Sequence, residues 1–266
     1  MEWFAWVKNP KLRAAADLIL NGGRLLEEDA RRVLDDLWEE SGTHILNKVG
    51  ATFYNENFPS HRDGGEWDEG RPYGVIDHYT AGISVVGTLK WFSNMTRSGT
   101  SSAHAIVDHG GRIYLVINPL THIAWHARRD SYTHVGIEHV NAGLLRKENG
   151  KFFYQGTRRY PNKYKHLPQH LEEWWEPFRV AQIVSNIVLK RWLIYAIPTL
   201  QQQHFVDHQT VDPNRKTDCG PFWPLDEINE LVFSAKPIRD LDWMKKEFLL
   251  LDDVGNFRME VREYLS

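Results

Sequence analysis

The chain of 266 residues contains a single cysteine, Cys219. An intrachain disulfide framework is therefore excluded, and the cysteine content does not indicate an oxidising compartment. The sequence also lacks any stretch approaching the roughly 18 consecutive apolar residues of a membrane-spanning helix. Its first residues lack the basic segment, apolar run and small-residue cleavage site of a signal peptide. We therefore expect a protein with no membrane span that is cytoplasmic as synthesised.

A strong positive charge is also missing. The formal net charge is −3 and the isoelectric point is near 6.5, so there is no overall basic field to hold nucleic acid or anionic lipid. We accordingly expect no nucleic-acid partner. Hydrophobic residues make up 42% and charged residues 25%, which is typical of a globular protein. Nothing in the sequence indicates an oligomeric state.

The elements that are present alternate between helix and strand. Apolar residues at helical spacing, with proline opening two of the segments, predict helices over residues 10–20, 25–40, 84–94 and 177–195. Runs of β-branched and aromatic residues predict strands over residues 73–79, 104–108, 112–117 and 135–140. A Gly-Gly turn joins the second and third strands as a hairpin. This alternation predicts an α/β fold with a mixed central β-sheet flanked by helices.

Segments without these patterns divide the chain. Glycine and proline mark a loop over residues 51–71, and a polar excursion is expected over 146–170. We predict three parts: an N-terminal helical extension over residues 1–57, a catalytic domain over 58–232 and a C-terminal tail over 233–266. The tail is expected to contain a helix from about residue 240. The N-terminal extension is expected to serve packing, with a binding module and an oligomerisation element as alternatives.

Two segments offer ligands for a metal ion. His78 lies near the end of the strand over 73–79, where a neutral imidazole is a natural zinc ligand. A loop that begins at His208 also contains Asp218, and prolines and a glycine stiffen this loop. Two nitrogens and one oxygen, with a fourth position open, are the pattern of a catalytic zinc site. The alternative is a structural histidine and a surface loop with a chance His–Asp pair.

Glu138 lies within the short apolar run 135–140. A carboxylate in such a strand needs a reason, because burying an unpaired charge is costly. One reason is a general base for a zinc-assisted hydrolysis. The other is that the side chain alternates outward to solvent. The residues alone leave both open.

Taken together, these pieces resemble the zinc-dependent N-acetylmuramoyl-L-alanine amidases that are related to phage lysozyme amidases and peptidoglycan recognition proteins. The closest resemblance is to the bacterial branch that cleaves muropeptides during cell-wall recycling or turnover. The similar segments follow the family order within roughly residues 58–225, and they are 58–60, 76–81, 102–114, 124–127, 135–143 and 208–221.

The resemblance implies hydrolysis of the amide between N-acetylmuramic acid and L-alanine in peptidoglycan or muropeptides. It implies one Zn²⁺ per chain, with three ligands: His78, His208 and Asp218. It also implies that Glu138 orients and deprotonates the attacking water, and that Lys216 stabilises the oxyanion.

The resemblance further implies contacts to the substrate from Trp125, His126 and Asn141. Cys219 departs from the family, which usually has proline after the acidic ligand, and its thiolate is an alternative zinc ligand to Asp218. Two alternatives to the amidase remain: a zinc amidase of the same fold acting on another amide, and a peptidoglycan-binding module without activity. The sequence does not separate a phage endolysin from a recycling enzyme or an exported effector.

Overall fold

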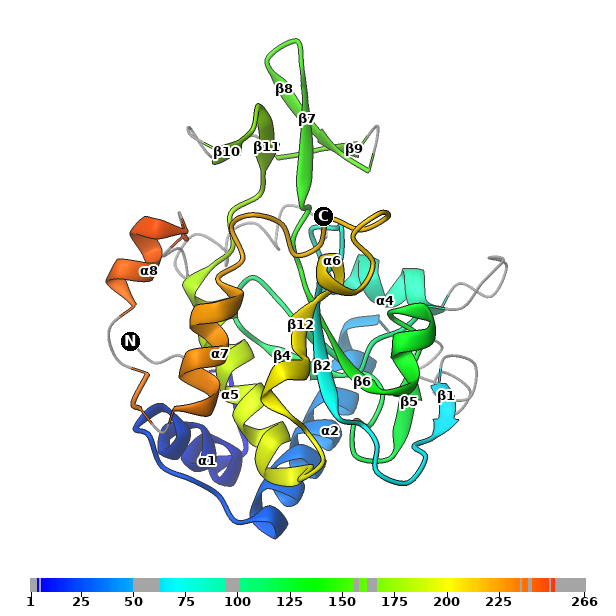
Figure 1. Cartoon of the computed structure of the whole chain (residues 1–266), viewed down its shortest axis with the longest axis vertical. Helices are drawn as coiled ribbons and strands as arrows, with labels where there is room; N and C mark the ends of the chain where they lie inside the picture. The colour runs from blue at the N-terminus through cyan, green and yellow to red at the C-terminus, as the bar shows by residue number, and fades with distance from the viewer. Residues whose placement is uncertain are drawn as a thin grey trace.

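The computed structural model has a five-stranded mixed β-sheet at its centre, with the strand order β12-β2-β6-β3-β4 (Figure 1). Four strands are parallel, and β4 is antiparallel at one edge. The strands are β2 (Gly74–Tyr79), β3 (Ala105–Val107), β4 (Ile113–Leu115), β6 (His134–His139) and β12 (Phe205–Asp207). The predicted α/β fold with a mixed central sheet is confirmed. The structure describes residues 4, 6–49, 63–93, 101–155, 158–161, 167–234, 236–238, 241–248 and 250–251.

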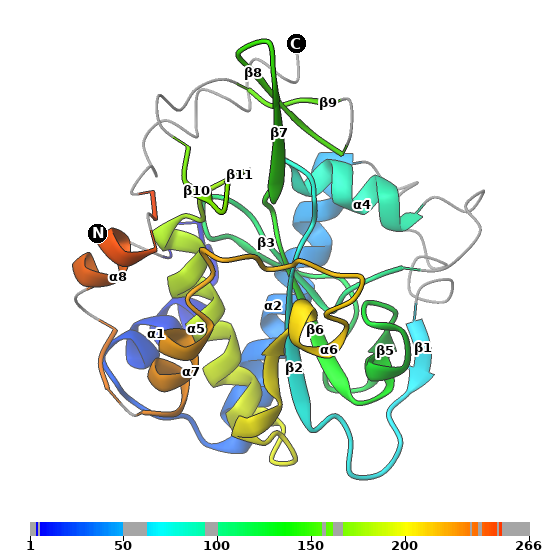
Figure 2. The ribbon, with the colours of Figure 1, turned by 45° about the horizontal axis from the view of Figure 1, so that its top comes forward.

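Helices cover both faces of this sheet (Figure 1, Figure 2). The helices on one side are α1 (Pro10–Leu20), α2 (Glu27–Val49), α5 (Val180–Ala196) and α7 (Leu225–Phe233). The opposite face is covered by α4 (Val85–Ser93), whose apolar residues form a separate cluster with Ile106 and Tyr114. Within the described residues, no helix combines the length and apolar character needed to cross a membrane.

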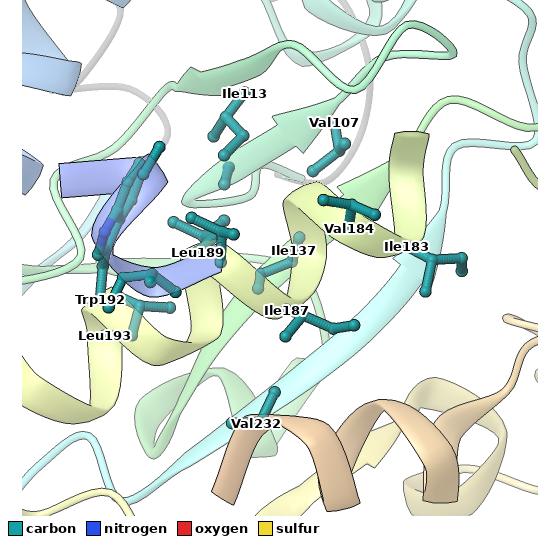
Figure 3. Packing of buried hydrophobic residues seen from close by; sticks show 14 of the residues in the cluster. Val107, Ile113, Ile137, Ile183, Val184, Ile187, Leu189, Trp192, Leu193 and Val232 are labelled. Atoms are coloured by element: carbon teal, nitrogen blue, oxygen red, sulfur yellow. The ribbon is translucent and has the colours of Figure 1, made fainter. Parts of the chain in front are cut away.

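The main hydrophobic core lies between the sheet and α5. Val184 and Ile187 of α5 belong to one cluster with Val107 of β3 and Ile137 of β6 (Figure 3). α5 is buried on nearly all sides, because the sheet lies on one side and other helices lie on the other. The N-terminal helices contribute to the same cluster through Leu12, Ile19, Leu34 and Leu37.

Arg191 of α5 joins the ends of two other helices. Its buried guanidinium donates to the carbonyl oxygen of Ile19 in α1 (2.9 Å). It also donates to the carbonyl oxygens of Leu231 in α7 (3.2 Å) and of Ser234 and Lys236 after α7 (2.7 Å each). The last carbonyls of a helix have no partner within the helix, and the donor-rich guanidinium supplies several at once. α1, α5 and the chain after α7 are therefore held together through one side chain.

Most predicted elements are present, some with shifted ends. α1 covers the predicted residues, and the Asn9 side chain caps its first turn by accepting from the amide of Lys11. α2 continues past residue 40 to Val49, and α5 begins at Val180 rather than at 177. The predicted boundary at 57/58 lies outside the described residues, and the one at 232/233 falls inside α7, a helix that was not predicted.

The excursion predicted over 146–170 is a second, antiparallel sheet, which we call the inserted sheet. Its strand order is β10-β11-β7-β8-β9, and it projects beyond the central sheet (Figure 1). Its strands are β7 (Leu144–Glu148), β8 (Lys151–Tyr154), β9 (Arg158–Arg159), β10 (Gln169–His170) and β11 (Glu173–Trp175). No strand was predicted here, because charged and aromatic residues are mixed without a clear alternation.

Smaller elements complete the structure. The described part of the predicted loop over 51–71 contains the strand β1 (Asp63–Glu66), which pairs antiparallel with β5 (His122–Ala124). The predicted C-terminal helix is present as a short helix. These elements are β1 (Asp63–Glu66), β5 (His122–Ala124), η1 (Arg128–Tyr132), η2 (Gln202–His204), α6 (His208–Val211) and α8 (Asp242–Glu247).

A buried ion pair fastens β2 to α5. The ammonium nitrogen of Lys190 lies 2.6 Å from Oδ2 of Asp77, and neither side chain is exposed to solvent. The amide of Asn186 donates to Oδ1 of Asp77 (2.9 Å), and the indole of Trp223 donates to Oδ2 (3.2 Å). Successive residues of a strand point to opposite faces of the sheet, so Asp77 faces the core while its neighbour His78 faces the other side. The ion pair therefore holds β2 in place at the position next to His78.

We predict that Lys190→Met lowers the free energy of unfolding by about 3–5 kcal/mol, because it leaves the Asp77 carboxylate buried without its cation. Chemical unfolding of the metal-free protein measures this change. Lys236→Met is the control: its exposed pair with Glu230 (3.0 Å) is expected to contribute about 1 kcal/mol or less. Equal stability of the two variants would contradict the prediction.

Candidate metal centre

The metal-ligating residues expected from the sequence converge at one edge of the central sheet. His78 lies near the end of β2, and His208 follows β12 as the first residue of α6. β2 and β12 are parallel neighbours, so their carboxyl ends meet at the same edge. Asp218 comes from the loop after α6. Such an edge is where open α/β sheets bind ligands.

The three side chains face one another at short range. Nδ1 of His78 lies 2.8 Å from Nδ1 of His208 and 3.1 Å from Oδ2 of Asp218. Nδ1 of His208 and Oδ2 of Asp218 are 3.0 Å apart. All three residues are buried, and their ligand atoms lie within 4.8 Å of one another. Two imidazole nitrogens that face each other beside a carboxylate need either a proton or a shared cation between them. This donor set fits a metal ion with N and O ligands.

The charge states of two of these groups suit metal binding. Burial lowers the pKa of His78, although Asp218 opposes the shift, so the ring favours the neutral form that offers a lone pair. Burial acts to raise the pKa of Asp218, but hydrogen bonds from His208 and His78 outweigh it and hold the pKa well below its usual range. Asp218 is therefore a carboxylate at neutral pH.

Cys219, the alternative ligand, is not part of this group. Its side chain is buried in the main hydrophobic cluster, next in sequence to Asp218. Burial, with smaller effects from the charges of Asp77 and Asp218, raises the pKa of the thiol well above its usual value. The structure therefore favours Asp218 over a Cys219 thiolate as the third ligand.

Glu138 lies beside the metal-binding group. In the register of β2 and β6 it is the partner of His78, so the two side chains share one face of the sheet. Its Oε2 atom is buried and has no hydrogen-bond partner in the described structure. Burial and the negative charge of Asp218 raise the pKa of Glu138 to about 8, against the opposing effect of Lys216. The structure thus favours the inward orientation over the solvent-facing one.

A cavity of about 1090 Å³ opens above these groups. His78, Glu138 and Asp218 line it together with residues of α4, η1 and the β8–β9 end of the inserted sheet. Cationic side chains outnumber carboxylates along its wall, and they are Lys90, Arg128, Arg158, Arg215 and Lys216. This surface suits a ligand that carries negative charge.

The loop after α6 places two of these cations near the ligands. The ammonium nitrogen of Lys216 lies 3.8 Å from Oδ1 of Asp218, and its side chain is 32% exposed. Nη2 of Arg215 lies 3.4 Å from Nε2 of His208, at the outer limit of a hydrogen bond. Lys216 thus borders both the metal-binding group and the open cavity.

The three residues expected to contact substrate lie in different surroundings. Trp125 lines the cavity, and its ring meets the ring of Tyr132 edge-on at 5.2 Å. Asn141 is fully buried and is not among the lining residues; its side chain accepts from the amide of Gly143 (2.7 Å) and donates to the carbonyl of Glu176 (3.2 Å). A contact between Asn141 and substrate stays a prediction.

His126, the third of these residues, lines the cavity and also touches a proposed ligand. Its Nδ1 atom lies 2.9 Å from Nε2 of His78. Burial, with smaller effects from His78 and His104, holds the pKa of His126 well below its usual value, so the ring is neutral. Sequence reasoning missed this contact, because nothing in the spacing of two distant histidines indicates that their rings meet.

The fold and this site define an α/β protein with a buried metal-binding group beside a carboxyl group in an open cavity. A family model described as N-acetylmuramoyl-L-alanine amidase matches residues 68–221, which is more than half of the chain. The chain therefore belongs to the N-acetylmuramoyl-L-alanine amidase family, and the resemblance found in the sequence is confirmed. No curated protein matches the chain.

Several solved structures are similar to this chain. One is the amidase AmiD from E. coli in complex with anhydro-N-acetylmuramic acid-L-Ala-D-γ-Glu-L-Lys (24% identity, 60% of this chain, 56% of that chain, TM-score 0.44). Another is AmpDh3 from Pseudomonas aeruginosa in complex with an anhydromuramic pentapeptide (23% identity, 62% and 61%, TM-score 0.42). A third is the endolysin amidase LysCS from Clostridium intestinale (18% identity, 60% and 82%, TM-score 0.38). The match spans less than two thirds of the first two structures.

Proposed function

We propose that this protein hydrolyses the amide between N-acetylmuramic acid and L-alanine in peptidoglycan or in soluble muropeptides. The observation that carries the proposal is the convergence of three buried ligand side chains beside Glu138, whose buried Oε2 atom has no hydrogen-bond partner in the described structure. Membership of the amidase family supplies the substrate class. The cationic cavity wall supports it, because stem peptides of muropeptides carry carboxylates.

We assign the metal as one Zn²⁺, held by His78, His208 and Asp218. Two imidazole nitrogens and one carboxylate oxygen, with a further position left open, are a ligand set of zinc hydrolases. When bound, zinc supplies a Lewis acid that polarises a carbonyl and lowers the pKa of water to about 7. His78 and Asp218 line the cavity, so a substrate amide has access to the site.

The remaining steps fall to two side chains of the cavity. Glu138 takes a proton from the attacking water and passes it to the leaving nitrogen of L-alanine. Its side chain lines the same cavity as His78 and Asp218, which places it to pass a proton between water and substrate. Lys216 places a positive charge at the cavity wall, where it stabilises the oxyanion of the tetrahedral intermediate.

The alternatives differ in what these groups would do. A binding module without activity does not need the Oε2 atom of Glu138 to be buried without a hydrogen-bond partner, so this atom supports a catalytic site. A zinc amidase acting on another amide would use the same groups with a different substrate. The cationic cavity wall then points to an anionic amide.

A digest of purified peptidoglycan and of soluble muropeptides tests the proposal. The zinc-loaded protein is expected to release stem peptides that begin at L-alanine, and mass spectrometry detects them. A strong chelator should stop the release, and added zinc should restore it. If the zinc-loaded protein releases no stem peptide but cleaves another anionic amide, the substrate assignment is wrong. Faster cleavage of soluble muropeptides than of intact wall would indicate a recycling role, and the reverse would indicate lysis.

A further inference from the structure

A chain of hydrogen bonds runs from the metal-binding group back into the sheet. Nε2 of His78 lies 2.9 Å from Nδ1 of His126, and Nε2 of His126 lies 2.9 Å from the carbonyl oxygen of His134 in β6. The two imidazole rings meet edge-on, with their centroids 5.0 Å apart. The outer nitrogen of His78 is thus connected to the backbone of β6 through one neighbouring ring.

The carbonyl group at the end of this series of hydrogen bonds determines which atom donates in each of them. A carbonyl oxygen only accepts, so Nε2 of His126 carries the hydrogen. A neutral ring with hydrogen on Nε2 has its lone pair on Nδ1, and it accepts a hydrogen bond from Nε2 of His78. The lone pair of His78 is then left on Nδ1, the atom that faces His208 and Asp218. These hydrogen bonds therefore select the tautomer of His78 with hydrogen on Nε2, which leaves Nδ1 free to bind a metal ion.

Gly136 provides the space that this arrangement needs. Gly136 and Glu138 lie on the same face of β6, since alternate residues of a strand point the same way. The ring of His126 occupies the place of a side chain at 136: a Cβ atom there would lie 2.4 Å from Cγ of His126. Glycine normally weakens a strand, and the close approach of the His126 ring explains why one is present at this position.

The backbone at His126 is held from the other side. The amides of His126 and Ala127 both donate to the hydroxyl of Ser131 in η1, at 3.0 and 2.8 Å. Ser131 is fully buried. Position, rotation and tautomer of the His126 ring are therefore set by contacts that involve neither substrate nor metal.

We infer that His126 is a positioning residue that orients His78 and fixes its tautomer for metal binding, and that Gly136 makes room for it. The inference rests on the proposed zinc site. A group that accepts a hydrogen bond from the non-ligating nitrogen of a histidine ligand typically contributes about 10–100-fold to metal affinity. In most such sites the partner is a carboxylate, a backbone carbonyl or water; here a second histidine carries the contact onward to a carbonyl.

Zinc affinity of the full chain, measured by competition with a chromophoric chelator, tests the inference. His126→Leu removes the acceptor and is expected to weaken zinc binding by about 10–100-fold. His126→Asn keeps an acceptor oxygen near the place of Nδ1 and should bind zinc more tightly than His126→Leu. Melting of the metal-free proteins shows whether each variant is folded.

His104→Leu is the matched control. His104 is fully buried, more so than the partly buried His126, and its ring also bonds to backbone groups: Nε2 lies 2.9 Å from the carbonyl of His122, and Nδ1 accepts from the amide of Gly136 at 2.9 Å. Its ring meets the ring of His126 edge-on with the centroids 5.8 Å apart, but in the described structure it has no hydrogen bond to His78, His208 or Asp218. This change should lower stability but leave zinc affinity of the folded protein near the original value. Equal losses of affinity in His104→Leu and His126→Leu would reduce His126 to a structural role and overturn the inference.

Gly136→Ala gives an independent test and applies even if His126→Leu does not fold. The added Cβ should displace the His126 ring and weaken zinc binding without touching a ligand. Because both changes act through one contact, Gly136→Ala combined with His126→Leu should weaken binding no more than His126→Leu alone. Unchanged affinity in Gly136→Ala and His126→Leu would overturn the inference while the zinc site stands. Failure of the unaltered protein to bind zinc would overturn both.

Discussion

Glu138→Gln is expected to lower kcat by about 10²–10⁴-fold, the usual contribution of a positioned general acid or base. The amide has nearly the shape of the carboxyl group but cannot take a proton from water. Glu138 is not one of the three ligand residues, so zinc should remain bound in stoichiometric amount. Loss of turnover with retention of metal separates the role of Glu138 from that of the ligands.

Release of stem peptide from a soluble muropeptide measures this effect, with zinc content determined on the same samples. Glu148→Gln is the matched control, because Glu148 is a half-exposed glutamate of β7 that pairs with Arg146 (3.0 Å) on the inserted sheet. Its activity should stay close to that of the unaltered protein. A near-normal kcat in Glu138→Gln would show that another group serves as the base.

His208→Ala should lose both zinc and activity. It removes one of two nitrogen ligands, and it leaves His78 and Asp218 as an incomplete set. A ligand that binds only the folded state at 100 times its Kd stabilises a protein by about 2.7 kcal/mol. The unaltered chain should therefore resist unfolding better when zinc is added, whereas His208→Ala should gain no stability from zinc.

Unfolding curves with and without zinc, together with metal analysis, measure this effect. Cys219→Ser is the control, since its thiol lies outside the group of three ligands. It should retain the full zinc content and the full gain in stability. Loss of zinc in Cys219→Ser, with His208→Ala still holding metal, would assign the site to a different set of residues.

The α/β fold was predictable because its signals are local. Asn9 and Pro10 mark the start of α1, and the apolar runs of β2 and β6 are those of strands buried on both faces. The inserted sheet was not predictable from such signals. Its cations lie over its aromatic rings, as Lys147 does over Trp174 at 4.6 Å, so charged residues take the place of the usual apolar positions.

A strand end, a stiff loop and the family resemblance pointed to His78, His208 and Asp218, and the structure brings these three side chains together. The orientation of those residues was not predictable. The contact between His78 and His126 depends on the packing of η1 against β6 and on the missing side chain at Gly136. Neither feature has a fixed spacing in sequence. The raised pKa of Glu138 likewise arises from burial, which only the folded cavity produces.

Arg191 joins α1, α5 and the chain after α7, and this connection limits which part of the protein can be transferred as a working domain into another protein. The family match begins at residue 68, yet a segment cut there would uncover the apolar side of α5 that α1 and α2 pack against. It would also remove the carbonyl of Ile19 from a buried guanidinium. The smallest transferable unit of this protein is therefore larger than its family domain: recombination or grafting has to carry the two N-terminal helices along with the catalytic sheet.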